Sequence, residues 1–285
     1  MTSSRHFHNV EQYLLPADAD ETQRLSLQHR VVVRAFGGKL WSGPPSLQAL
    51  QGADVLDSGT GNGIWLSDLE RRLAEGGVAP GHLIGVDLSD RQFPSASPRR
   101  LATLQVADIL NLPAEWTGRF SLVHQRLLVA GLSGAQWKTC LGQLLRVLQP
   151  DTGCVELIET GHFAHPYPAG SPGDVLMRVL RQTFAKRGLV FDILARLGDW
   201  LAEAGFVDVA VTTVEIPMSR RREDGHEAGE NFFRGLLGLQ EAAVQSGAIA
   251  SRQDYIELMD RVRAQWDADD TCNTFAAFSA RRPAT

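Results

Sequence analysis

The chain has 285 residues, of which 44% are hydrophobic and 21% are charged, a composition typical of a globular protein with enough apolar material for a sizeable core. Its 33 acidic and 28 basic residues give a net charge of −5 at pH 7, the wrong sign for a surface that follows phosphates. We therefore expect no nucleic-acid partner, and we interpret the arginine run from Arg220 to Arg222 as a solvated turn.

The cysteines and the apolar runs bear on the compartment. Cys140, Cys154 and Cys272 are far apart and lack CxxC spacing, which argues against a disulfide framework and a zinc site, and no metal ligands are predicted. The first residues lack the apolar core of a signal peptide, and no run approaches the roughly 18 apolar residues of a membrane helix. We expect a soluble, cytoplasmic protein without a membrane partner.

Hydrophobic periodicity divides the chain into three zones. Apolar positions at helical spacing between Asp20 and Phe36 predict an N-terminal helix with Asp20 as its cap. From about residue 53 to 160, short apolar runs alternate with helical stretches, the pattern of βαβ units in a parallel sheet. The remainder alternates helices with two late strands, which can pair antiparallel at the sheet edge.

The predicted elements follow in chain order. Strands are predicted at residues 53–59, 82–89, 101–109, 120–127, 153–160, 207–216 and 273–281. Helices are predicted at residues 20–36, 62–75, 135–148, 173–187, 192–204, 228–246 and 251–266. The helices between the two late strands are well placed to form a lid or a substrate wall.

The segment VLDSGTGNGIWLSDL carries the strongest chemical signal, because an apolar strand leads into an acid, Asp57, then into alternating glycines and an amphipathic helix. Gly59, Gly61 and Gly63 allow a ligand to approach the main chain at a helix N-terminus, although a tight turn alone would also use glycines. A dinucleotide fold requires GxGxxG, and Ile64 stands at its third glycine. This spacing favours S-adenosylmethionine (SAM) over NAD.

Two further acids end the next predicted strands. Asp87 ends the second strand, where it can accept hydrogen bonds from both hydroxyls of a ribose. Asp108 ends the third strand, where it can accept from an adenine amino group while Ile109 packs on the ring. Each acid alone is more commonly a surface or capping residue. The ordered series of Asp57, Asp87 and Asp108 indicates an adenosine-containing ligand.

Together these motifs resemble a known family. DSGTGNG, GVDLS, VADI, FSLVHQR and LLRVLQPDTGCVELIE are similar to motifs of class I SAM-dependent methyltransferases, over residues 53–160. The upstream segment YLLPADADETQRLSLQHRVVVRAFGGKL resembles a subgroup related to trans-aconitate methyltransferase and common in fungal natural-product (secondary-metabolism) pathways.

The resemblance implies an α/β fold, with a Rossmann-like, seven-stranded, mostly parallel sheet, helices on both faces, a terminal antiparallel hairpin, and N-terminal and late helical lids. It implies a lid segment at residues 1–45 and a methyltransferase domain at residues 46–285, with helical substrate-cap insertions at about 161–205 and 220–268. The cofactor would lie across the carboxyl edge of the sheet.

The resemblance also implies a set of cofactor contacts. Asp57 and the loop glycines would line the methionine and ribose side, Asp87 the ribose, and Asp108 the adenine. The methionine end would be contacted by residues of the N-terminal segment. The predicted cofactor-binding residues are Tyr13, Arg24, Gln28, Asp57, Gly59, Gly61, Gly63, Asp87, Asp108, Ile109 and His124.

The fourth strand bears on the methyl acceptor. FSLVHQR stands where enzymes that methylate nucleobase or glutamine nitrogens carry Asn/Asp-Pro-Pro-Tyr, which favours a hydroxyl, carboxyl or ordinary amine as the acceptor. Among these we expect a hydroxyl or carboxyl oxygen of a small molecule. A hydroxyl has to lose a proton, and a histidine near the carboxyl edge is the natural base. We predict His162, after the fifth strand, slightly ahead of His124, which can equally bind the cofactor or brace the strand.

Three functions stay open at this point. The first is methyl transfer from SAM to a small molecule. The second is an NAD-type oxidoreductase, which the missing third glycine disfavours. The third is a SAM-binding protein without methyl transfer, a regulator or a SAM-assisted catalyst of another reaction, whose cofactor motifs would be the same.

Overall fold

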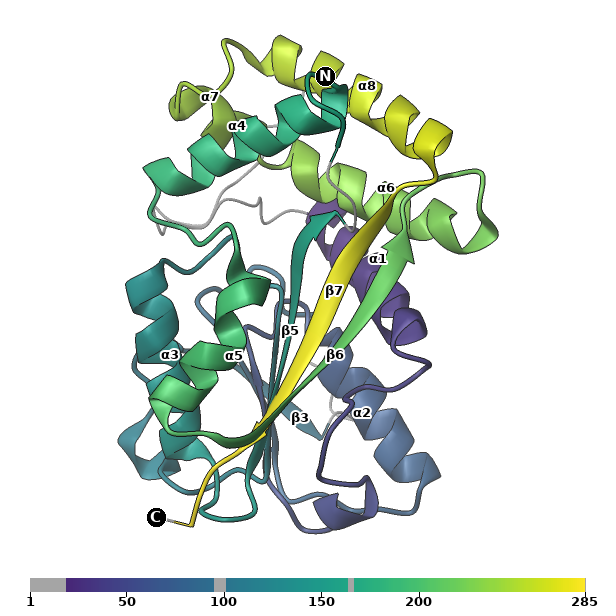
Figure 1. Cartoon of the computed structure of the whole chain (residues 1–285). Coiled ribbons are helices and arrows are strands. Elements are labelled where there is room, and N and C mark those ends of the chain that lie inside the picture. The colour runs from purple at the N-terminus through teal and green to yellow at the C-terminus, as the bar shows by residue number, and fades with distance from the viewer. Residues whose placement is uncertain (1–18, 95–100, 164–166, 285) are drawn as a thin grey trace.

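The computed structural model describes residues 19–94, 101–163 and 167–284, apart from the side chains of residues 19, 20, 162 and 163. A seven-stranded sheet of order β3-β2-β1-β4-β5-β7-β6 forms its centre (Figure 1). Neighbours among β1 to β5 pair in parallel, whereas β7 pairs antiparallel with both β5 and β6. The strands are β1 (Val55–Ser58), β2 (Leu83–Asp87), β3 (Ala102–Val106), β4 (Leu122–Arg126), β5 (Cys154–Phe163), β6 (Val207–Pro217) and β7 (Cys272–Arg281). The predicted α/β sheet with a terminal antiparallel hairpin is confirmed.

Helices cover both faces of the sheet because successive strand residues point to opposite faces. Val55 and Leu122 pack with α2 (Ile64–Glu75), whereas the residues that follow them, Leu56 and Val123, belong to the cluster of α3 (Gly134–Val147) and α5 (Ile193–Ala204). Figure 1 shows α2 on one side of the sheet and α3 and α5 on the other. Strands buried on both faces explain the continuous apolar runs in the sequence.

A second layer of helices packs at the end of the sheet where β5, β6 and β7 extend beyond their shorter neighbours (Figure 1). Their apolar faces form one buried cluster with the far ends of these strands, for example around Tyr255, Trp266 and Phe275. The helices are α1 (Ala19–Ala35), α4 (Pro172–Lys186), α6 (Glu223–Leu237), α7 (Gln240–Gln245) and α8 (Arg252–Asp269). This layer adjoins the carboxyl edge of the parallel strands.

Two elements differ from the sequence-based expectation. The single helix predicted at residues 228–246 is divided into α6 and α7, with Gly238 as the C-cap of α6. Glycine costs about 1 kcal/mol relative to alanine inside a helix, so Gly235 and Gly238 make a break inexpensive here. In addition, α5 falls within the predicted insertion at 161–205 but packs beside α3 on the sheet, not with the second layer.

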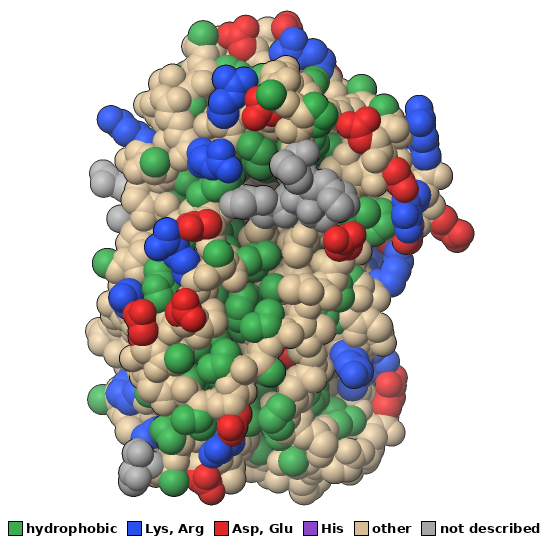
Figure 2. Space-filling model, viewed as in Figure 1, with side chains coloured by type: hydrophobic (Ala, Val, Ile, Leu, Met, Phe, Trp, Pro, Cys, Tyr) green, Lys and Arg blue, Asp and Glu red, His purple; other side chains and the backbone are tan. Residues whose placement is uncertain are grey.

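The surface mixes both signs of charge. Arg220 and Arg222 pair with Asp267 and Asp224, at 2.9 Å and 3.0 Å from the respective Nε atoms, so these arginines are locally compensated. On the face seen in Figure 2, basic and acidic side chains are interspersed. Among the helices of the described ranges, none combines the length and the apolar character needed to cross a membrane.

Candidate cofactor and acceptor site

The glycine loop between β1 and α2 bends sharply at the carboxyl edge of the sheet. Gly59 and Gly61 have φ angles of +71° and +55°, a region that side-chain-bearing residues rarely adopt. The N–H of Thr60 donates to the carbonyl of Val86 (2.8 Å), which ties the loop to β2. The loop backbone therefore lines an open space at this edge.

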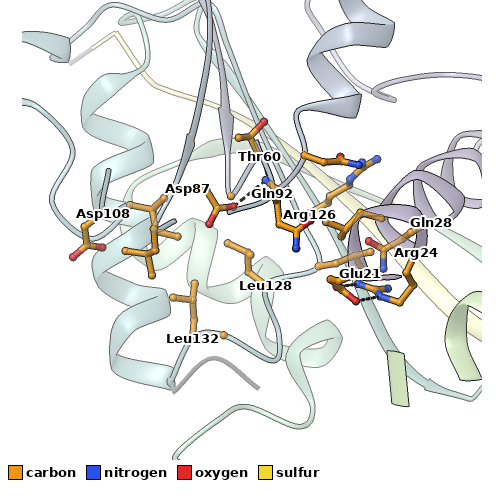
Figure 3. A pocket seen from close by; sticks show the side chains of 18 of the residues that line it. Glu21, Arg24, Gln28, Thr60, Asp87, Gln92, Asp108, Arg126, Leu128 and Leu132 are labelled. Carbon is orange, nitrogen blue, oxygen red and sulfur yellow. Dashed lines mark hydrogen bonds and ion pairs between the residues drawn. The ribbon is translucent and has the colours of Figure 1, made fainter. Parts of the chain in front are cut away.

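That space is the first of two neighbouring cavities (Figure 3). Its walls come from the carboxyl ends of β1 to β4, from the loops that follow them, and from α1. Of the predicted cofactor residues, it brings together Arg24, Gln28, Gly59, Gly61, Asp87, Asp108 and Ile109. Asn62, Leu88, Gln92, Leu110, Leu128, Leu132 and Gln136 also line it.

The carboxylates of the first cavity suit a nucleoside. One oxygen of Asp87 accepts the backbone N–H of Gly61 (2.9 Å), so this side chain is held between β2 and the glycine loop. Asp108, at the next strand end, accepts the N–H of Leu110 (2.9 Å), while the neighbouring Ile109 is buried and supplies an apolar wall. Acceptors for hydroxyl and amino groups beside an apolar surface match the chemistry of adenosine.

Asp57 and His124 do not line either cavity. The Asp57 carboxylate accepts hydrogen bonds from Thr60 Oγ1 (2.6 Å) and from His124 Nδ1–H (2.8 Å), so it faces into the protein. The His124 ring is 0% exposed and lies flat against Trp65, with ring centroids 4.0 Å apart. Burial lowers the pKa of His124 against the opposing effect of Asp57. In the described structure this histidine braces the strand beneath the glycine loop.

Three other predicted residues are not placed at the first cavity. Gly63 is the N-cap of α2, with φ of +69°, and does not line the first cavity. Tyr13 lies outside the described residues. The backbone of His162 belongs to β5, but its side chain lies outside what the structure describes.

Two charged features of the first cavity were not predicted from the sequence. The Arg24 guanidinium donates to both oxygens of Glu21, at 2.6 Å and 2.7 Å, within α1. Arg126, the last residue of β4, also lines the cavity. Both arginines stood in motifs already singled out, DETQR and FSLVHQR. Arg24 was predicted to contact the cofactor, but nothing in the sequence marked its pairing with Glu21 or singled out Arg126.

The second cavity has predominantly apolar walls and about 880 Å³ of empty space, counted out to the solvent. Phe184 and Phe191 meet edge to face on one side (5.8 Å between centroids), as do Phe232 and Phe275 (5.7 Å) on another. Other apolar lining residues are Val129, Ala130, Met177, Leu180, Leu236 and Leu239. This cavity suits an apolar ligand with a flat surface.

Arg24, Gln28 and Leu127 line both cavities and mark the border between them. Leu127 has φ of +58°, an uncommon conformation for a residue with a side chain. Its N–H donates to the carbonyl of Ile158 (2.8 Å), which attaches the loop after β4 to β5. A side chain at this border can contact a ligand in either of the two cavities.

Comparisons with known proteins agree with this architecture. A family model described as a methyltransferase domain matches residues 55–151. The N-methyltransferase sirN of Leptosphaeria maculans is 32% identical over 284 residues, covering 95% of each chain. The N-methyltransferase gliN of Aspergillus fumigatus is 28% identical over 286 residues, covering 95% of this chain and 96% of its own.

Two solved structures share the fold. A phosphoethanolamine N-methyltransferase 2 of Haemonchus contortus, in complex with SAM, aligns with a TM-score of 0.50 and 21% identity over 97% of this chain and 55% of its own. The [4+2]-cyclase SpnF aligns with a TM-score of 0.50 and 16% identity over 96% of this chain and 98% of its own. With sirN 32% identical over nearly its whole length, the chain belongs to the class I SAM-dependent methyltransferases, and its cofactor is SAM.

Proposed function

We propose that the chain transfers a methyl group from SAM to a nitrogen of an apolar small molecule. The observation that carries this proposal is the pair of adjoining cavities, one with acceptors suited to adenosine and one lined by phenylalanines, with Arg24, Gln28 and Leu127 common to both. A methyltransferase needs such a border, because donor and acceptor must meet in a fixed orientation.

The residues of the first cavity would hold the cofactor, which supplies an electrophilic methyl group when bound. Asp87 is the proposed acceptor for the ribose hydroxyls, and Asp108 with Ile109 would hold the adenine. Gly59 and Gly61 allow close approach to the loop backbone, and their positive φ angles explain why side chains are disfavoured there. The buried Asp57 and His124 support this loop from below.

The choice of nitrogen rests on the relatives. Four of the related fungal proteins, sirN, gliN, verN and tcpN, are named N-methyltransferases. The oxygen acceptor expected from the sequence has no support of this kind, so we propose nitrogen in its place. At the border, Arg24 and Gln28 supply hydrogen-bond donors suited to a carbonyl or another polar group beside the nitrogen.

The second cavity would hold the body of the acceptor. Its walls come mainly from α4, α6, β5 and β7. The contributions of α4 and α6, together with Arg24 and Gln28 of α1, support the proposal that the segment 1–45 and helices within residues 161–205 and 220–268 form a lid and a substrate cap. Burying apolar surface contributes about 25 cal/mol per Å², so such a chamber favours uncharged, ring-bearing molecules.

A methyl-transfer assay tests the proposal. Purified protein is incubated with SAM carrying a labelled methyl group and with a panel of aromatic small molecules that differ in bearing an amine, an amide, a hydroxyl or a thiol. We expect formation of S-adenosylhomocysteine and of a product whose methyl group is on nitrogen. Transfer exclusively to oxygen or sulfur would contradict the nitrogen proposal.

A matched binding measurement separates failure of the acceptor panel from failure of the active site. Calorimetry with SAM and S-adenosylhomocysteine reports the cofactor site without an acceptor. SAM binding with no methyl transfer to any member of a broad panel would favour the non-methylating alternative, a SAM-binding regulator or a catalyst of another reaction.

A further inference from the structure

The two arginines that line the first cavity differ in their partners. Its charged lining residues are Glu21, Arg24, Asp87, Asp108 and Arg126. Arg24 is paired with Glu21 through two hydrogen bonds of 2.6 Å and 2.7 Å, so each charge of this pair has an immediate partner. Arg126 is the remaining cation of the set, and its partner must be sought elsewhere.

In the part of the chain that the structure describes, the Arg126 guanidinium has one hydrogen bond, from Nη1 to Nδ1 of His29 (3.0 Å). No carboxylate of those residues forms an ion pair with it. Burial lowers the pKa of Arg126 to about 10, against the weaker opposite effects of Asp57 and Asp68. A half-buried guanidinium on a cavity wall that forms no ion pair with the described residues is a site for an anionic group of a ligand.

The order of the strands places Arg126 relative to the rest of the ligand. Asp108 follows β3, Asp87 ends β2, the glycine loop follows β1, and Arg126 ends β4, in the spatial order β3-β2-β1-β4. Figure 3 shows Asp108 and Asp87 toward one side of the cavity and Arg24 toward the other, with Arg126 between them. A ligand whose adenosine contacts Asp108 and Asp87 therefore extends its other end toward Arg126.

We propose that Arg126 binds the α-carboxylate at the amino-acid end of SAM. This deepens the function proposed above and rests on SAM as the cofactor, but not on the identity of the methyl acceptor. It also changes the role expected for Arg24, which the sequence interpretation assigned to the methionine end. Because Arg24 is engaged by Glu21 and lines both cavities, we place it at the border toward the acceptor.

His29 and Asp68 hold Arg126 in position. Arginine can only donate, so Nδ1 of His29 must be the acceptor, and its proton is on Nε2, which faces Asp68 Oδ2 at 3.1 Å. Burial and the nearby Arg126 lower the pKa of His29 to about 4, which keeps the ring neutral at physiological pH. Asp68 is bound in turn by Arg72, at 3.1 Å and 3.3 Å. This chain of contacts connects α2 and α1 to the end of β4.

The test compares two ligands that differ by the carboxylate alone. SAM and decarboxylated SAM are titrated by calorimetry into wild-type protein and into the Arg126→Gln, Arg126→Lys and Arg24→Gln variants. We expect wild-type protein to bind SAM about 10- to 100-fold more tightly than decarboxylated SAM, as one or two charge-assisted hydrogen bonds allow. In Arg126→Gln the two affinities should become nearly equal, through loss of SAM affinity.

The ratio of the two affinities within one variant does not depend on how much of that variant is folded, so a partly misfolded sample still gives an answer. Arg126→Lys should keep part of the ratio, because the charge remains without the planar fork. Arg24→Gln, the matched control, should keep the wild-type ratio. The proposal is overturned if wild-type protein does not discriminate, if Arg126→Gln weakens both ligands equally, or if Arg24→Gln is the variant that abolishes the ratio.

Discussion

The Glu159 carboxylate accepts the backbone N–H of Leu128 (2.7 Å) and, through its second oxygen, that of Val129 (3.2 Å). Glu159 lies in β5 and is 0% exposed. These bonds fix the chain directly after Leu127, whose left-handed backbone, with φ of +58°, is typically about 1–3 kcal/mol less favourable than an ordinary conformation. Glu159 thereby holds the loop that separates the two cavities.

Glu159→Gln should change how stability depends on pH. Burial raises the pKa of Glu159 from 4.5 to about 8, although backbone N–H groups act in the opposite direction. The folded protein thus retains a proton that the unfolded chain releases above pH 4.5, so this residue's contribution to stability is lost as the pH rises toward about 8. Glutamine does not titrate. We expect the variant to be less stable than wild type by about 1–3 kcal/mol at pH 5, with a smaller difference at pH 8.

Denaturant unfolding at several values between pH 5 and pH 8 measures this difference. Glu203→Gln, which changes an exposed glutamate on α5, is the control and should show the wild-type dependence on pH. A difference between Glu159→Gln and wild type that grows with pH would mean that Glu159 ionises in its ordinary range.

Asp87→Ala should weaken cofactor binding. The substitution removes the proposed acceptor for the ribose hydroxyls and also the acceptor of the Gly61 N–H (2.9 Å). Charge-assisted hydrogen bonds are worth about 1.5–3 kcal/mol each, so we expect SAM affinity to fall roughly 10- to 100-fold in a folded protein. Calorimetry measures the loss, with the exposed Asp90→Ala as the control that keeps wild-type affinity. Unchanged binding in Asp87→Ala would place the ribose elsewhere.

His124→Asn should lower stability without altering the pH profile of turnover. The ring is fully buried against Trp65, and Nδ1 donates to Asp57, so its loss leaves a space and disturbs the support of the glycine loop. We expect a cost of about 2–4 kcal/mol, as for other large-to-small changes in a core. Rate measurements across the pH range alongside His162→Asn compare the two histidines. If His124→Asn shifted the pH profile of turnover without loss of stability, His124 would instead be the catalytic base.

Much of the fold follows from local pattern. The alternation of short apolar runs and helical periodicity predicted the sheet and its terminal hairpin, because strands buried on both faces need continuous apolar residues. Because such strands are apolar on both faces, their sequence does not indicate toward which face a polar side chain points. Asp57 lies in such a strand, and no apolar alternation around it indicates that its carboxylate faces His124. The position of the strand could therefore be predicted from the sequence, but the direction of the Asp57 side chain could not.

The charged contacts of the site depend on tertiary distance. His29 and Arg126 are 97 residues apart and meet because α1 packs over the end of β4. Helical periodicity specifies which face of α1 is apolar, but not which strand end that face meets. The resemblance pointed to Arg24 and not to Arg126, and the partners that distinguish the two arginines, Glu21 and His29, are known only from the structure.

Phe232→Leu should weaken acceptor binding and leave cofactor binding unchanged. Phe232 lines the second cavity and contacts Phe275 edge to face, whereas its neighbour Phe233 is buried under Arg263 and does not line the cavity. Aromatic pairs contribute about 0.5–1.5 kcal/mol beyond the area they bury, so removal of one ring from the wall should weaken a flat apolar ligand several-fold to about 30-fold. N-phenyl-1-naphthylamine, a neutral aromatic amine whose fluorescence rises in apolar surroundings, reports this affinity without turnover.

Phe233→Leu is the matched control, expected to lower stability but to keep the wild-type affinity for the probe and for SAM. Equal weakening of the probe in both variants, or probe affinity unaffected in Phe232→Leu, would mean that the acceptor does not occupy the phenylalanine-lined cavity.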